Sequence, residues 1–176
     1  MLSAMTTPHP ETLPDLLWTE FGSALQMLES AITACPADVW GSEAGFQEFW
    51  YIAYHTLFFT DFYGSESTHD FKPPPPFTLS ELDPQGVFPE RVYTKEELLD
   101  YLAFVMDKNR ALIRRLTPEK AAQRFENEFQ NFSLLHLVLF TTRHVQHHAA
   151  QLHLLLRQRV DATPGWVKTP RWALEG

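Results

Sequence analysis

The chain has little cysteine and little positive charge. Cys35 is the only cysteine in 176 residues, which excludes an internal disulfide framework and the paired cysteines of zinc or redox motifs. Cys35 directly precedes Pro36 in an expected turn between helices, and we interpret it as a structural residue. Lysine and arginine total 14 against 22 aspartates and glutamates, for a formal net charge of -8. A nucleic-acid partner is therefore not expected, because phosphate binding needs clustered basic residues.

Long apolar runs are also missing. Apolar runs such as FWYIAY before His55 and LVLF before Thr141 are far shorter than the roughly 18 residues that a membrane span needs. The first residues, MLSAMTTPHPE, have neither the basic nor the apolar stretch of a secretory signal. We therefore expect a cytoplasmic protein with no membrane partner.

The composition is that of a globular protein with many aromatic residues. Apolar residues make up 44% of the chain, which contains 14 phenylalanines and 5 tryptophans. The length suits one domain. We expect a single domain over residues 1–176, with its core at about 14–160 and a tail at 161–176. Because the tail places Trp166 and Trp172 among turn residues, we expect it to wrap either the domain or a second subunit.

Four segments show the three- and four-residue spacing of apolar residues that indicates an amphipathic helix. They run from about Pro14 to Ala34, Gly45 to Tyr63, Thr94 to Leu116 and Ser133 to Val160. The third opens with TKEE, where Thr94 and Glu97 have the spacing of a capping box. No segment alternates apolar and polar residues over the length of a strand. The sequence therefore predicts an all-α fold.

The connection between the second and third predicted helices, residues 64–93, is long and rich in proline. A helix of about 18 residues is about 27 Å long, and an extended proline-rich chain covers about 3.1 Å per residue. This crossover can therefore return along the whole domain and leave the second and third helices parallel, in an up-down-down-up four-helix bundle. The alternative is a loop disordered in its middle. Three phenylalanines favour packing against the bundle instead: Phe71, Phe77 and Phe88.

Four of the eight histidines fall within ten positions of the last predicted helix. His144 and His148 are four residues apart, so both rings can point at one place, which is the spacing of helical histidine pairs that bind metals. His147 and His153 point elsewhere around the helix. His55 lies on the apolar face of the second predicted helix and offers a third ligand, as in bundles whose metal sites use facing helices.

Three imidazoles would leave a coordination position open, which is typical of catalytic rather than structural zinc sites. The alternative is that these histidines are satisfied by solvent or by partners in the core. Glu48 lies seven residues before His55 and is a candidate hydrogen-bond partner or general base, although a solvated residue at the helix start would look the same. The other side chains that could line the open side, or simply pack in the bundle, are Tyr51, Tyr54 and Gln151.

The stretch HVQHHAAQL, which begins at His144, and His55 within AYHTLFF resemble the DinB-like superfamily of four-helix-bundle metalloenzymes. The signature of that superfamily is one histidine in helix two and an HxxHHxGQ stretch in helix four. This sequence departs from it at Ala150, where glycine is common. The similarity covers about residues 14–160, including the long crossover.

The resemblance implies that His55, His144 and His148 bind a divalent metal, zinc or nickel, in a protein that is often a homodimer. Characterised relatives are transferases and an isomerase that use low-molecular-weight thiols, and a metal with an open position can deprotonate such a thiol near neutral pH. Two hypotheses follow. The protein is a metal-dependent enzyme that activates a small thiol or water, or it is a non-catalytic module that binds a metal or ligand in a stress response.

Overall fold

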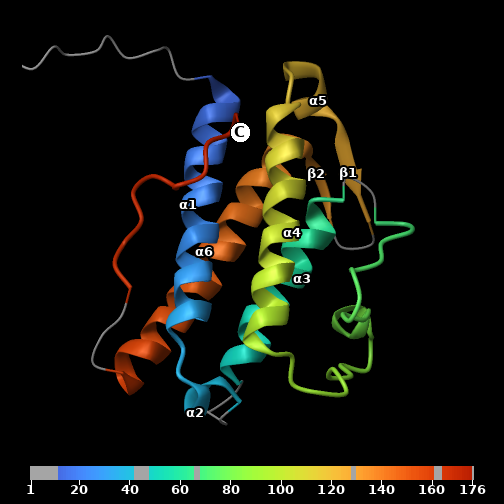
Figure 1. Ribbon diagram of the computed structural model, residues 1–176. Coiled ribbons are helices and arrows are strands. Elements are labelled where there is room, and N and C mark those ends of the chain that lie inside the picture. The colour runs from blue at the N-terminus through green and yellow to red at the C-terminus, as the bar shows by residue number, and fades with distance from the viewer. Residues whose placement is uncertain (1–11, 42–47, 66–67, 128–129, 161–163, 176) are drawn as a thin grey trace, which may run out of the picture.

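Four long helices form most of the structure. This computed structural model describes residues 12–41, 48–65, 68–127, 130–160 and 164–175. The long helices are α1 (Leu13–Ala34), α3 (Phe49–Tyr63), α4 (Lys95–Arg114) and α6 (Leu134–Arg159). Helix α1 packs against α6 and α4, and α3 packs against the same two helices, with the apolar core between them (Figure 1). The predicted all-α fold is therefore confirmed for the bulk of the chain. None of the helices in the described ranges is both long and apolar enough to cross a membrane.

The helices begin where capping residues satisfy the first free backbone amides. At α4, the Thr94 hydroxyl accepts a hydrogen bond from the Glu97 amide at 3.2 Å, and the Glu97 carboxylate accepts one from the Thr94 amide at 2.8 Å. The capping box expected at TKEE is confirmed. At α6, the Ser133 hydroxyl accepts a hydrogen bond from the His136 amide. Helix α3 begins at Phe49; the start predicted at Gly45 falls outside the described residues.

Several short elements were not predicted. They are α2 (Ala37–Trp40), the 3-10 helix η1 (Ser80–Leu82), α5 (Pro118–Ala122) and the antiparallel strands β1 (Arg124–Glu126) and β2 (Asn131–Ser133). The absence of strands was thus a wrong prediction for this stretch. Strands of three residues are too short to show an alternating pattern. The pair is fixed instead by Phe125, which is buried and faces Phe132 across the two strands.

The crossover packs against the helices. Phe71 and Phe77 are buried, as expected, whereas Phe88 is 61% exposed and contacts α3 through the Tyr51 ring, at 4.8 Å between ring centroids. The Tyr54 hydroxyl donates to the carbonyl of Thr78 at 3.1 Å. Contacts of this kind bring the segment around η1 onto α3, in the part of the chain coloured green in Figure 1.

The tail packs against the helices of its own chain, which was one of its two expected arrangements. Figure 1 shows residues 164–175 returning alongside α1. The Trp18 indole donates to the carbonyl of Trp172 at 2.8 Å, and the Arg171 guanidinium lies 2.6 Å from the Glu29 carboxylate. These contacts fasten the tail to α1, while Trp166 stays 69% exposed.

Cys35 ends α1 and is buried. Burial raises the pKa of its thiol to about 11, with nearby Asp38 adding to the effect and Lys95 opposing it. Because the thiolate is the nucleophilic form of cysteine, this side chain is unreactive near neutral pH. The structural role expected for Cys35 fits these surroundings.

Candidate metal centre

Three histidines from two helices meet between α3 and α6. His55 lies in the middle of α3, and His144 and His148 lie one turn apart in α6. The ring centroid of His55 is 5.5 Å from that of His144 and 4.9 Å from that of His148, and the latter two are 4.6 Å apart. One ring nitrogen from each residue lies within 4.8 Å of the others. The three side chains therefore form a group that could hold a metal ion.

Aromatic side chains enclose one side of this histidine cluster. The Phe59 ring lies 4.9 Å from that of His55 and 6.0 Å from that of His144, and the Tyr63 ring lies 6.4 Å from His144. The His55 side chain nevertheless remains 29% exposed. The cluster is thus shielded by apolar rings on one side and open to solvent at His55.

Two of the three rings have their orientation fixed by an acceptor. His55 Nδ1 lies 2.6 Å from Oε2 of Glu81, and His148 Nδ1 lies 2.7 Å from Oε1 of Gln151. A carboxylate or amide oxygen can only accept, so each Nδ1 carries the proton and donates it. The Nε2 lone pairs of His55 and His148 are left free, which is the arrangement found in metal-binding histidines.

His144 is the most deeply placed of the three. Its Nδ1 is buried without a hydrogen-bond partner among the described residues, which costs about 1–3 kcal/mol for a polar group of this kind. Burial, and after it the neighbouring His148 and His55, lowers the pKa of His144 to about 3. Burial also lowers the pKa of His148 to about 4, against the opposing effect of its hydrogen bond to Gln151. Both imidazoles are therefore neutral at pH 7, the form that binds metals.

The donor set fits a divalent transition metal. Zinc binds imidazole nitrogen at about 2.0–2.1 Å, so two nitrogens on one ion lie at most roughly 4.2 Å apart. The nitrogens of the histidine cluster lie within 4.8 Å of one another, so small side-chain rotations would close the remaining gap. Neutral imidazoles suit zinc, nickel, copper and iron alike.

Comparison with known proteins identifies the family. A family model described as the DinB superfamily matches residues 20–152. The chain belongs to the DinB superfamily. The matched region begins within α1, includes the crossover and ends at Leu152, the last residue of HVQHHAAQL, so it contains all three histidines. No curated protein matches this DinB-superfamily chain.

The two candidate catalytic residues of this DinB-superfamily site, Tyr51 and Glu48, differ in their contacts. The Tyr51 ring lies 6.4 Å from that of His55. Burial raises the pKa of the Tyr51 hydroxyl, and a hydrogen bond to the Glu81 carboxylate raises it further, so this hydroxyl stays protonated. Glu48 stands at the N-cap of α3, where its carboxylate accepts a hydrogen bond from the Trp50 indole. The carboxylate that contacts His55 is Glu81, and catalytic roles for Tyr51 and Glu48 remain predictions.

The other two histidines of the HVQHHAAQL region of α6, His147 and His153, lie outside the histidine cluster, as their positions around the helix indicated. His147 is exposed and contacts the cluster only through His148, at 5.0 Å between ring centroids. His153 is buried on another face, where its Nε2 lies 2.9 Å from the Met27 carbonyl. Tyr54 does not line the open side, because it is fully buried and holds the crossover.

Glu81 is the residue of the site that sequence reasoning missed. It belongs to η1, in the crossover, and lies 26 positions after His55. Its side chain is only 4% exposed. Nothing in the pattern around SEL marks it, because it is one acidic residue in a stretch without helical or strand periodicity. Only the packing of the crossover on α3 brings it to the histidine.

Proposed function

We propose that this DinB-superfamily protein is a divalent-metal-dependent enzyme in which His55, His144 and His148 hold zinc or nickel. The ion would activate a low-molecular-weight thiol or water for transfer to an electrophilic small molecule. The convergence of three ring nitrogens within 4.8 Å carries this proposal. The exposure of His55, at 29% of its side chain, supports an open position for a small molecule.

The chemistry divides between the ion and the chain. A bound divalent ion supplies Lewis acidity, which allows a thiol to ionise near neutral pH. The chain positions the ligands through the acceptors Glu81 and Gln151 and shields one side of them with Phe59. It provides no reactive thiol of its own from Cys35, which is buried. The nucleophilic sulfur would therefore come from the small molecule.

The proposed scaffold is a four-helix bundle in up-down-down-up order. The packing of α1 and α3 against both α4 and α6 supports it, as does the course of the ribbon in Figure 1, where a long crossover separates α3 from α4. We also propose that the protein is a homodimer, as the resemblance to thiol-dependent relatives implies. A two-fold dimer is the commonest closed assembly.

Metal content tests the ligand set. We would reconstitute untagged protein with zinc or nickel, remove excess metal and measure bound metal by plasma mass spectrometry. The wild type should retain one ion per chain, whereas His55→Ala and His144→Ala should retain none. His147→Ala is the matched control, because His147 neighbours His148 but lies outside the histidine cluster. A wild-type protein that holds no metal would overturn the proposal.

Turnover tests the enzymatic part. Metal-loaded protein would be incubated with glutathione, bacillithiol or mycothiol and an activated electrophile, and with activated esters for hydrolysis. Product formation above the His144→Ala background is expected.

If the wild type binds metal but consumes no substrate, a non-catalytic binding module replaces the enzyme. The position of the ligands gives that alternative a physical basis. An ion there would join α3 to α6 and stabilise the native state.

A further inference from the structure

Glu81 connects the crossover to the histidine cluster. We propose that Glu81 is a positioning residue, which holds the ring of His55 with Nε2 toward the other two imidazoles and so makes metal affinity depend on the crossover. This inference rests on the metal-binding function proposed above. It assigns a role to a segment that carries none of the three ligands.

The helix alone does not fix the His55 ring. The terminal torsion of a histidine is broad and roughly two-fold, so either face and either nitrogen can point toward the cluster. The carboxylate selects one orientation, because its Oε2 lies 2.6 Å from Nδ1 of His55. The Glu81 side chain is 4% exposed, so water competes little for this hydrogen bond. His55 therefore presents Nε2, with its lone pair, to the cluster.

Glu81 is itself held in place. The Tyr51 hydroxyl hydrogen-bonds its carboxylate, and η1 is closed by the bond from the Leu82 amide to the Leu79 carbonyl at 2.9 Å. One turn along α3, the Tyr54 hydroxyl lies 3.4 Å from the Ser80 hydroxyl. Residues 51, 54 and 55 share one face of α3, since residues three and four apart are neighbours on a helix. That face receives η1 and sets the position of the carboxylate.

Glu81 acts through His55 and is not a ligand in this arrangement. Among the described residues, the group whose ligand atoms all lie within 4.8 Å of one another consists of three histidines and includes no carboxylate. Its Oε2 is engaged by His55, and the carboxylate also interacts with the Tyr51 hydroxyl. A carboxylate in this position raises the basicity of the imidazole and fixes its tautomer.

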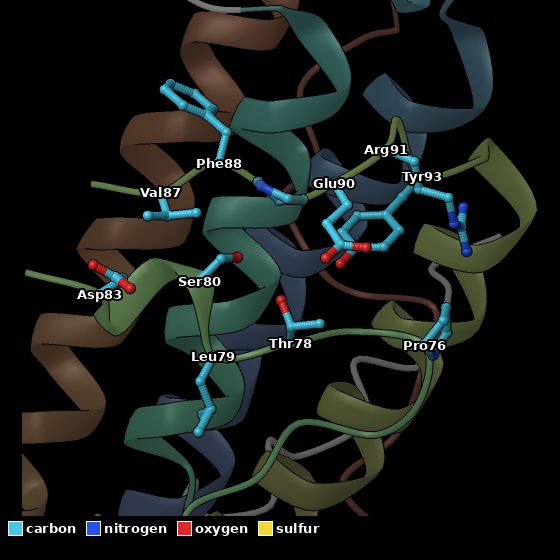
Figure 2. Close-up of a pocket in the computed structure, with 11 residues that line it drawn as sticks. Pro76, Thr78, Leu79, Ser80, Asp83, Val87, Phe88, Glu90, Arg91 and Tyr93 are labelled. Atoms are coloured by element: carbon cyan, nitrogen blue, oxygen red, sulfur yellow. The ribbon is translucent and has the colours of Figure 1, made fainter. Parts of the chain in front are cut away.

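The other side of η1 faces a cavity of about 570 Å³ in the crossover. Ser80 and Asp83, which flank Glu81 and Leu82, line this cavity together with Phe88 and Tyr93 (Figure 2). The Phe88 ring also lies 4.8 Å from that of Tyr51. The short segment that holds His55 is thus a wall of the cavity, and the crossover is part of the metal site's support.

Cobalt binding tests the proposal, since Co²⁺ can be followed by its visible absorption. We would titrate metal-free wild type, Glu81→Ala, Glu81→Gln and Glu90→Ala with Co²⁺ alone. Removing a partner of a metal-binding histidine costs about 10- to 100-fold in affinity, so Glu81→Ala should raise the Kd by that factor and change the absorption bands. Glu81→Gln should lose less, because an amide oxygen accepts the same hydrogen bond. Glu90→Ala, an exposed carboxylate that lines the cavity, should match the wild type.

A measurement on metal-free protein separates positioning from general damage. Nitrogen NMR of labelled histidine should show His55 protonated at Nδ1 in the wild type and in Glu81→Gln, and a mixture of tautomers in Glu81→Ala. The inference alone is overturned if the wild type binds Co²⁺ and Glu81→Ala binds it with a Kd within about threefold, well under the expected loss. Equal losses in Glu81→Ala and Glu90→Ala would also overturn it. A wild type that binds no Co²⁺ would overturn both the proposed function and this inference.

Discussion

Replacing Lys108 by methionine should destabilise the scaffold that holds the site. Asp61, six residues after His55 on α3, is buried with its side chain 1% exposed. Lys108 Nζ lies 2.5 Å from its Oδ1, and the Tyr101 hydroxyl donates to Oδ2 at 2.9 Å. Both partners come from α4, so this carboxylate joins the two helices. Lys108→Met removes the cation that pairs with Asp61 and leaves a buried negative charge.

The size of the effect follows from burial. Removing one member of a buried ion pair costs about 3–5 kcal/mol. The Lys108 side chain is 27% exposed and the Tyr101 bond remains, so we expect the lower end, about 3 kcal/mol. At about 2–4 °C per kcal/mol, Tm should fall by about 6–12 °C. Adding Asp61→Asn should restore part of the loss, because a buried amide costs less than an unpaired carboxylate.

Urea unfolding followed by circular dichroism, in the presence of a chelator, measures these free energies. Arg110→Met is the control, since Arg110 pairs three residues away on the same helix with Asp107, whose side chain is 64% exposed, and the pair should contribute no more than about 0.5 kcal/mol. The reasoning is refuted if Lys108→Met loses less than about 1 kcal/mol, since a buried pair should cost more. It is also refuted if the double variant loses the sum of the two single losses, which would show no coupling between the residues.

Three further predictions concern the metal, acid and the tail. Zinc at about 100 times its Kd should stabilise the wild type by about 2.7 kcal/mol in thermal unfolding, and should leave His148→Ala unchanged. The hydrogen bond from Arg91 lowers the pKa of Glu97 from 4.5 to about 2. The stability that the ionised Glu97 contributes is therefore present above pH 4.5 and is lost as the pH falls toward 2. Over that pH range, the Tm of Glu97→Ala should depend less on pH than the Tm of the wild type. A Cβ on Gly22 would lie 3.0 Å from Pro170 and 3.3 Å from the Trp18 ring, so Gly22→Ala should lower Tm in the full chain and lower it less in a chain ending at residue 169, where the Pro170 contact is gone.

The sequence predicted the long helices because their signals are local. Apolar spacing located all four, and the Thr94 capping box marked the start of α4. The strands β1 and β2 escaped prediction because their pairing depends on Phe125 being buried against the core. The structure of the crossover could be predicted only in part. Its phenylalanines indicated packing: Phe71 and Phe77 are buried, whereas Phe88 contacts Tyr51 but remains 61% exposed.

In the candidate site, too, some features follow from local patterns and others depend on tertiary packing. Helical spacing alone placed His144 and His148 on one face, since four residues make about one helical turn, and apolar spacing placed His55 on the apolar side of another helix. Tertiary packing brought one ring nitrogen from each histidine within 4.8 Å of the others, because this depends on how α3 packs on α6. It also decided the carboxylate partner of His55. Glu48, close in sequence, is bound by a tryptophan, whereas Glu81 reaches the histidine because the crossover folds back onto α3. A periodic pattern reports which residues share a face of one helix, but contacts between distant segments depend on the packing of the whole chain.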